Sequence, residues 1–296
     1  MTINKLIATT SWVIVLFGTA YSGVLAQDAT SAAQSTPSAT PAPDSMVSTD
    51  QVFTKPRQTE EILRLRELYQ DQVERYTNLE RQFVVNKGQY KKLNTLQSLE
   101  LAVKTTREVM LARTDVLITY FELMRASLDD TEGVELVEKE KNTNEMISYI
   151  NTLRDHRQAV LNSTTREDIA ARVTEFEKLS EPFESTAYKS LALIRIGDIQ
   201  TVFDKSEIIY RDVLQYHQNN PTTPLRQQER VRAYKEVDNA IEKTRGDLLT
   251  VRTDYAEENK LNRSSYDSRL VKSLNTTYSG TSQILAFLKE LFVELT

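Results

Sequence analysis

Residues 234–255, YKEVDNAIEKTRGDLLTVRTDY, decide the fold class of this chain. Apolar or small side chains recur there every three or four residues, at Tyr234, Val237, Ile241, Thr244, Leu248, Val251 and Tyr255. An α-helix brings these positions onto one face, and a heptad-like repeat is typical of helices that pack side by side. We therefore predict a long amphipathic helix here, buried along this seam against other helices.

Five similar seams cover the rest of the chain from about residue 56. They run through Ile62–Phe83, Leu96–Met124, Met146–Val160, Ile169–Ile194 and Leu270–Leu291. Several of these helices approach 30 residues, or about 45 Å. The sequence predicts an all-α fold over residues 56–296: an elongated antiparallel bundle, or an array of coiled-coil hairpins, of about six helices. The most apolar stretch, Leu191–Phe203, is expected at the centre of the core.

Helix boundaries are predicted from caps and breakers. We expect the first helix to use Pro56 in its first turn and to stop at Asn86-Lys87-Gly88, because glycine accepts the left-handed conformation. The fourth helix should open with a capping box, Thr165 with Asp168 or Thr164 with Glu167. It should kink or break at Pro182, which removes one backbone hydrogen bond. Asn219-Asn220-Pro221 should end it, and Ser264 with Asp267 should cap the last helix.

A few polar features interrupt the seams. Arg113 lies in an apolar seam and is expected to extend its charged end to the edge. The tyrosines of the seams are expected to pack in the core. The mostly charged segment Glu135–Asn144 is a candidate to extend beyond the bundle, and the turn Asp129–Gly133 is interpreted as a solvated helix end. A calcium loop with Gly133 at position six would place Leu128 and Lys139 at ligand positions, and neither can bind calcium.

The N-terminal segment 1–26 resembles a secretory signal in its layout. Lys5 precedes an uncharged stretch with the apolar centre Trp12–Phe17, and Val24-Leu25-Ala26 predicts cleavage after Ala26. An uncleaved membrane anchor is the alternative, because 22 uncharged residues suffice to cross a bilayer core of about 30 Å. Either reading predicts an exported protein, secreted or held at the cell envelope.

Residues 27–55 are expected to form a disordered linker. Of the 26 residues from Gln27 to Val52, 17 are Ala, Ser, Thr or Pro. Such a stretch has too little apolar surface to offset the entropy lost on ordering. After an uncleaved anchor it would hold the bundle away from the membrane; after a cleaved signal it would have no such role.

Composition excludes several classes of function. The chain has no cysteine, so it forms neither disulfides nor thiolate metal sites. Its net charge of −5 argues against broad nucleic-acid binding, which depends on neutralising phosphates. Only five glycines follow the leader, which disfavours an α/β fold with phosphate-binding turns.

No catalytic or metal-binding motif is found. The residues three before His156 and His217 are Leu153 and Leu214, so the Glu-x-x-His pairs of di-iron bundles are missing. The Gly-x-Ser-x-Gly, P-loop and His-Glu-x-x-His motifs are absent too. We therefore assign no catalytic, cofactor-binding or metal-binding residue.

These observations favour a non-catalytic helical scaffold, spacer or protein-interaction module. It would bind a protein partner, or a second copy of itself, through its helical faces. A helical module that binds a small ligand near Pro182–Phe203 is the main alternative. An enzyme with paired carboxylates is a third, since such pairs need no visible motif.

Overall fold

The computed structural model describes residues 60–220, 224–257 and 261–293, and these are helical with no strand. The long helices are α3 (Glu60–Leu93), α4 (Leu96–Asp130), α5 (Leu136–Asn162), α6 (Arg166–Asn219), α7 (Pro224–Glu257) and α9 (Val271–Val293). A short α8 (Arg263–Ser265) and a π-helical turn η2 (Tyr266–Leu270) lead into α9. The prediction of an all-α fold with about six helices is confirmed. The predicted leader, linker and Pro56 lie outside the described residues.

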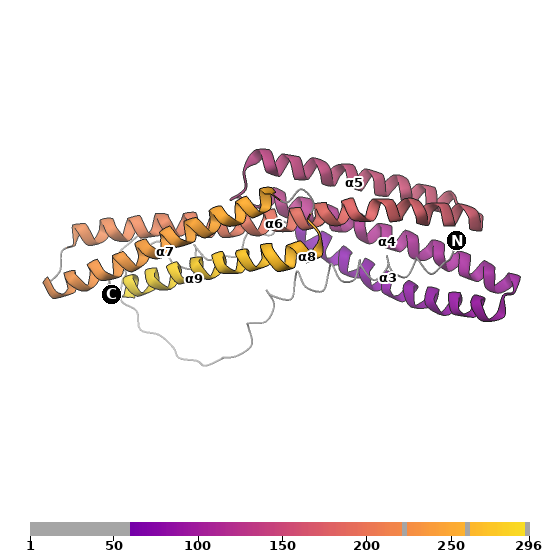
Figure 1. The fold of residues 1–296 in the computed structure, drawn as a ribbon, viewed down its shortest axis with the longest axis horizontal. Coiled ribbons are helices and arrows are strands. Elements are labelled where there is room, and N and C mark those ends of the chain that lie inside the picture. Colours follow the sequence, from indigo (N-terminus) through magenta and orange to yellow (C-terminus); the bar gives the residue numbers. More distant parts are fainter. Residues whose placement is uncertain (1–59, 221–223, 258–260, 294–296) are drawn as a thin grey trace, which may run out of the picture.

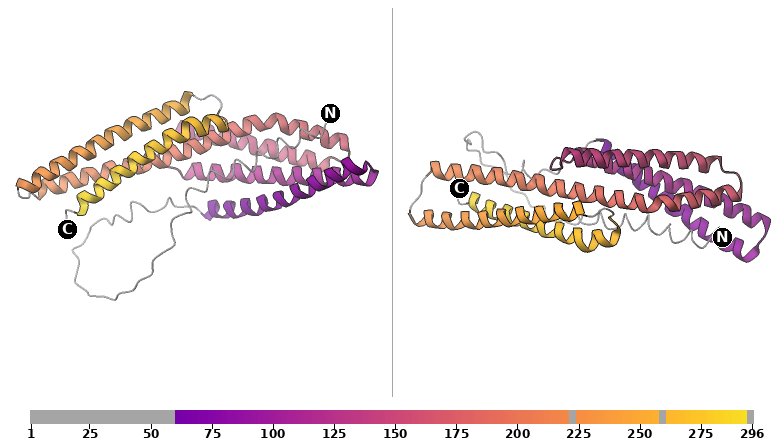
Figure 2. Two further views of the ribbon diagram at one scale, coloured as in Figure 1. Left: turned by 60° about the horizontal axis from the view of Figure 1, so that its bottom comes forward. Right: turned by 45° about the horizontal axis from the view of Figure 1, so that its top comes forward.

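The helices form an elongated rod made of two bundles (Figure 1). Helices α3, α4 and α5 pack with the first half of α6, and the second half of α6 packs with α7 and α9. The two views of Figure 2 show the bundles following each other along the long axis. Because α6 runs through both, we call them the N-terminal and C-terminal bundles and their meeting point the junction.

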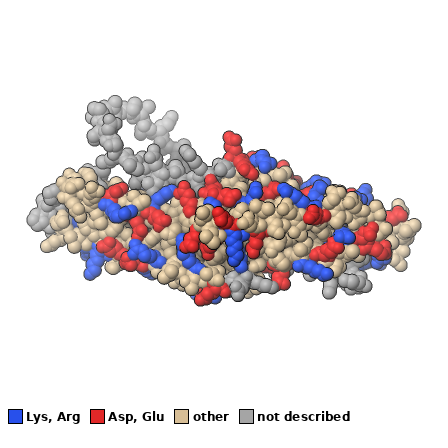
Figure 3. All heavy atoms as spheres, turned by 90° about the horizontal axis from the view of Figure 1, so that it is seen from above, with Lys and Arg blue, Asp and Glu red and all other residues tan. Residues whose placement is uncertain are grey.

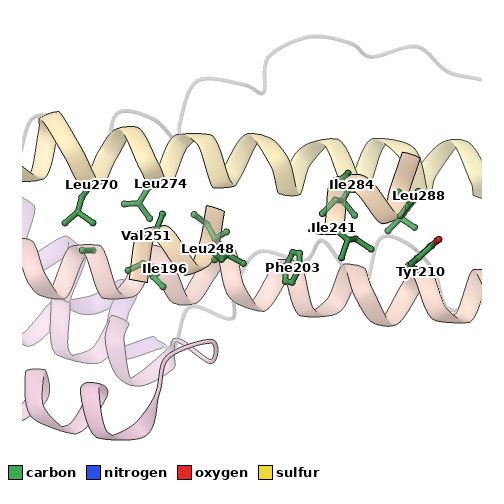
Figure 4. Packing of buried hydrophobic residues seen from close by; sticks show 14 of the residues in the cluster. Ile196, Phe203, Tyr210, Ile241, Leu248, Val251, Leu270, Leu274, Ile284 and Leu288 are labelled. Atoms are coloured by element: carbon green, nitrogen blue, oxygen red, sulfur yellow. The ribbon is translucent and has the colours of Figure 1, made fainter. Parts of the chain in front are cut away.

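The apolar stretch 191–203 lies where α6 passes from one core to the other. Leu193 packs in the core of the N-terminal bundle, whereas Ile196 and Phe203 pack in that of the C-terminal bundle. Figure 4 shows Ile196, Phe203 and Tyr210 of α6 facing the α9 side, with side chains of α7 filling the space between. Leu191 and Tyr255 pack against both cores. The predicted central position of this stretch is therefore correct, and the apolar core is continuous through the junction.

Capping boxes open two of the long helices. At the start of α6, the Asp168 backbone N–H donates to Thr165 Oγ1 at 3.1 Å, and the Thr165 N–H donates to the Asp168 carboxylate at 3.1 Å. These bonds hold the pKa of Asp168 below its usual value. Thr95 and Ser98 make the same reciprocal pair before α4. Of the two boxes predicted for α6, the one with Thr165 is confirmed, and Asn219 ends this helix as expected.

The first helix does not stop at Gly88. It continues to Leu93, and the turn is made by Asn94, whose φ of 48° lies in the left-handed region. Lys87 is buried and places its Nζ 5.3 Å from the centre of the Phe83 ring, so the contact face of α3 reaches the residue just before the glycine. Packing against α4 outweighs the cost of one glycine within a helix, which is about 1 kcal/mol.

Pro182 does not break α6, which is helical from Arg166 to Asn219. The next residue, Phe183, is buried with its ring 4.9 Å from that of Tyr149 and 5.9 Å from that of Phe121. These aromatic contacts hold the helix in place across the proline, whose usual cost within a helix is about 3 kcal/mol. The predicted cap of the last helix is also wrong: Asn262 with Ser265 forms the box instead of Ser264 with Asp267.

Candidate functional site at the junction

The loop between α4 and α5 docks on α6 through two glycines. The Gly133 N–H donates to Thr201 Oγ1 at 3.0 Å, and the Thr201 hydroxyl donates to the Gly197 carbonyl at 2.9 Å. A Cβ on Gly133 would lie 2.3 Å from the Gly197 carbonyl oxygen, and one on Gly197 would lie 2.4 Å from Thr131 Cγ2. The loop backbone therefore touches the helix backbone at a distance that only glycine permits.

This contact corrects the interpretation of 129–133 as a solvated helix end in part, because Asp129 and Glu132 are exposed as expected while Thr131 and Gly133 pack on α6. Thr131 is buried, and the carbonyls at the end of α4 accept hydrogen bonds from a side chain rather than from water alone. Lys139 Nζ donates to the Asp129 carbonyl at 2.6 Å and to the Thr131 carbonyl at 3.0 Å. Its positive charge also suits the negative end of the α4 dipole.

Arg252 of α7 connects the C-terminal bundle to this loop. Its Nη1 lies 3.2 Å from the Glu135 carboxylate, and its Nη2 donates to the Gly133 carbonyl at 3.4 Å and to Gln200 Oε1 at 3.3 Å. The Glu135 side chain is largely exposed, so the ion pair alone stabilises by under about 1 kcal/mol. The main contribution of Arg252 is to position the elements, because this one side chain of α7 contacts both α6 and the loop.

The start of α5 completes the junction. Asn142 is buried and donates through Nδ2 to the Tyr255 hydroxyl of α7 at 3.2 Å. Burial raises the pKa of Tyr255 to about 12. It also raises the pKa of Glu138, with a further contribution from the nearby Glu135 carboxylate. The expectation that 135–144 extends beyond the bundle is therefore wrong, because this charged segment faces α7 at the middle of the rod.

The 133–138 segment, α6 and α7 line an open groove of about 510 Å³. Its lining residues are Gly133, Val134, Glu135, Glu138, Leu193, Ile196, Leu249, Arg252, Thr253, Tyr255, Ala256 and Glu257. Leu193 and Ile196 belong to the range 182–203 in which a ligand site was hypothesised, whereas the remaining lining comes from α7 and from the 133–138 segment. Apolar side chains next to three carboxylates and one guanidinium suit a small molecule with an apolar part and a positive charge.

Arg113 does not reach the edge of the N-terminal bundle. It is 3 % exposed, with its Cζ 3.6 Å from the centre of the Phe176 ring, and burial lowers its pKa to about 10. No ion pair to Arg113 is found within the described ranges, and its Nε has no hydrogen-bond partner there. The cation–π contact thus replaces the expected exposure to solvent, because the packed α3, α5 and α6 leave no path outward.

The two histidines lie in different bundles. His156 packs beside Phe176 with the ring centres 5.5 Å apart, and burial together with the Arg113 charge lowers its pKa to about 4. His217 is hydrogen-bonded through Nδ1 to the Tyr234 hydroxyl in the C-terminal bundle. Both are buried and neutral, which suits packing better than proton transfer at neutral pH.

The predicted tyrosine positions fit the core. Tyr76 and Tyr120 are buried, and Tyr69, Tyr234 and Tyr255 are partly buried against the apolar clusters. The contact that sequence reasoning missed is the one between Gly133 and Gly197. Its signal was a glycine in the middle of the most apolar helical stretch, where a close backbone approach is the usual reason for glycine.

Across the described part of the chain, no three His, Asp or Glu side chains gather as a metal site would require. None of the helices described there combines the length and apolar content needed to cross a membrane. Comparison with known proteins adds no assignment: no protein-family model matches the chain, and neither a curated protein nor a solved structure is significantly similar to it.

Proposed function

We propose that this protein is a non-catalytic helical scaffold or spacer that acts outside the cytoplasm, at the cell envelope or beyond it. The observation that carries this proposal is the 54-residue helix α6, which both bundles share. At a rise of about 1.5 Å per residue it is about 80 Å long. A continuous helix with a continuous core around it holds the two ends of the rod at a set separation.

The surface supports a role in contacts rather than in catalysis. Basic and acidic side chains alternate along the face in Figure 3, without an extended area of one sign. Both ends of the rod carry exposed apolar side chains, Leu93 and Leu96 near the α3–α4 turn and Tyr216 and Val231 near the α6–α7 turn. The middle of the rod exposes others, among them Val137 and Leu249. Such positions suit partners that bind each end. Export itself is proposed from the signal-like segment 1–26.

The proposal predicts that the two ends of the rod contact different partners in the producing cell. A photo-crosslinking residue at Gln97 probes one end, and one at Gln218 probes the other; both positions are exposed. We expect distinct adducts from the two sites, and few from the exposed mid-rod control Lys272. Intact mass of the purified adducts also establishes whether residues 1–26 are retained.

Two results would contradict the spacer role. One is adduct formation at Lys272 alone, since a spacer contacts its partners through its ends. The other is recovery of the protein in the cytoplasmic fraction with residues 1–26 intact. Retention of these residues in the membrane fraction would support the spacer role and assign the tether to 27–55, whereas their loss would support a secreted scaffold.

The groove at the junction favours a second candidate function, the binding of a small organic cation with an apolar part. We expect such amines to raise the melting temperature of the protein, and matched carboxylates to leave it unchanged, because three glutamates line the groove. Thr253→Trp fills the groove and should abolish the shift. Thr250→Trp is the matched control, since Thr250 is exposed on the same helix and makes the same hydroxyl-to-carbonyl bond one turn back. Equal shifts for both variants would exclude the groove as the site.

A further inference from the structure

The end of the α3–α4 hairpin extends past the other helices of its bundle. We call residues 81–104 the hairpin tip. The three views of Figures 1 and 2 show its end, at the α3–α4 turn, projecting beyond the α5–α6 turn at the same end of the rod. Arg107 of α4 donates to the Leu161 carbonyl near the end of α5, and Met110, Val160 and Ile169 form the cluster nearest to that turn. Beyond this level α3 and α4 have mainly each other to pack against.

Large apolar side chains of the hairpin tip face solvent. Exposed fractions are 64 % for Leu93 and 72 % for Leu96, the residues on either side of the Asn94-Thr95 turn. Val84, Val85 and Leu101 are exposed farther back along the two helices. Five such residues in one protruding hairpin are more than the scattered apolar residues of an ordinary surface.

The hairpin tip is basic in an acidic protein. It contains Arg81, Lys87, Lys91, Lys92 and Lys104 against the single carboxylate of Glu100, a net charge of +4, while the whole chain carries −5. Lys91 and Lys92 are exposed and lie directly before Leu93. Burial and the neighbouring Lys91 charge both lower the pKa of Lys87, a sign of how closely the positive charges gather.

We propose that the hairpin tip docks end-on onto an anionic lipid surface. Leu93 and Leu96 enter the headgroup region, and the lysines beside them contact the lipid phosphates. Apolar side chains inserted at the interface and basic residues at its surface act together in this mode of binding, and neither alone holds a protein firmly. The inference goes beyond the spacer role, because it names a lipid surface for one end of the rod; docking can fail while the spacer role stands.

A lipid surface fits the hairpin tip better than an acidic protein does. Leu93 and Leu96 flank the turn at the end of the rod, and the exposed Lys91 and Lys92 directly precede Leu93, so a flat surface can contact the leucines and the lysines at once. An acidic protein partner would be held by the lysines and would not require exposed leucines at the extremity. The test therefore compares substitutions of the lysines with substitutions of the leucines.

The chain has no cysteine, so one introduced cysteine reports on one place. Full-length Gln97→Cys, labelled with an environment-sensitive fluorophore, reports on the hairpin tip, and Asn239→Cys on the exposed face of α7 is its control. The probe is a vesicle of phosphatidylglycerol and phosphatidylcholine in equal parts, compared with phosphatidylcholine alone. We expect a blue shift at position 97 with the anionic vesicles, none at 239, and its loss at about 0.5 M salt. A leader that inserted into the vesicles would not move the fluorescence at 97.

Two pairs of variants separate charge from apolar contact. Lys91→Gln with Lys92→Gln should weaken vesicle binding about 30-fold, because each basic residue near an anionic surface contributes a factor of about five. Leu93→Ser with Leu96→Ser should weaken it about tenfold or more. Matched controls away from the hairpin tip, Lys235→Gln with Lys243→Gln and Ile208→Ser with Leu63→Ser, should bind as the unchanged protein does. All these positions are exposed, and circular dichroism verifies that each variant is folded.

Three outcomes would overturn the proposal. The first is no blue shift at position 97 with anionic vesicles. The second is binding that the hairpin-tip variants and their controls weaken equally. The third is a response at 97 to soluble polyglutamate that the leucine substitutions leave intact, together with none to vesicles, which would indicate an acidic polypeptide as the partner.

Discussion

Alanine at Gly133 is expected to lower the free energy of unfolding by about 1–3 kcal/mol, the range typical of overpacking. The added methyl group would lie 2.3 Å from the backbone carbonyl oxygen of Gly197, which cannot turn aside as a side chain can. The loop must then leave α6, and the bonds of Gly133 to Thr201 and Arg252 are lost with it. Urea unfolding followed by circular dichroism measures the change.

Other glycines of the same chain supply the controls. Gly88 and Gly246 lie within helices with no atom within 4 Å of the added Cβ, so alanine there should stabilise the protein by about 0.5–1 kcal/mol. Gly197→Ala should destabilise it, since its Cβ would meet Thr131 and Val134 side-chain atoms at 2.4 and 2.5 Å. If Gly133→Ala left the unfolding midpoint unchanged, the close docking of the loop would be wrong.

The second large effect concerns pH. His156 has a pKa of about 4 in the folded chain and about 6.5 when unfolded. Between these pH values the histidine is protonated in the unfolded state and neutral in the native state. The free energy of unfolding therefore decreases as pH falls from about 6.5 to 4. The full loss is about 3 kcal/mol. Its causes are burial and the adjacent Arg113 charge, with Arg172 adding to them and Glu175 opposing.

His156→Leu should remove this acid-induced loss, so the variant should gain stability relative to the unchanged protein as pH falls. Asp198 provides a control of opposite sign. Burial raises its pKa from 3.8 to about 6, so its contribution is lost as pH rises through 4 to 6. Asp198→Asn should therefore gain relative stability toward pH 7, by about 3 kcal/mol. Urea midpoints measured across this range test both, and parallel pH profiles for all three proteins would refute the assignment.

The long seams were predictable because burial of an apolar face dominates the position of a helix. Met146, Ile150, Leu153 and Val160 are all buried as their spacing predicts, and so are Val237, Ile241, Leu248 and Val251. Spacing reports the face that a helix buries and needs no knowledge of the partner. The capping box at Thr165 was found for a related reason, since its bonds are local in sequence.

The errors concern positions where distant contacts outweigh a local preference. Gly88 is a good helix stop by itself, but α3 packs along α4 and continues to the turn at Asn94. The sequence of the charged start of α5 is typical of a solvated segment. In the structure, Asn142 of this segment is hydrogen-bonded to Tyr255, which is 113 residues away in the chain. Arg113 follows the same rule, because the side chains that enclose it come from other helices. The junction groove combines three segments far apart in the chain, so sequence reasoning reached only its α6 part.

The sharing of α6 has a consequence for the order in which the protein assembles. When synthesis has reached Asn219, all four helices of the N-terminal bundle have been made, while the second half of α6 presents Ile199, Phe203 and Tyr210 with no partner helix yet made. These side chains stay uncovered until α7 and the last helix, α9, leave the ribosome. A chain terminated before α9 would therefore have a folded N-terminal bundle and a C-terminal segment with exposed apolar surface. Chaperones and proteases act on such segments.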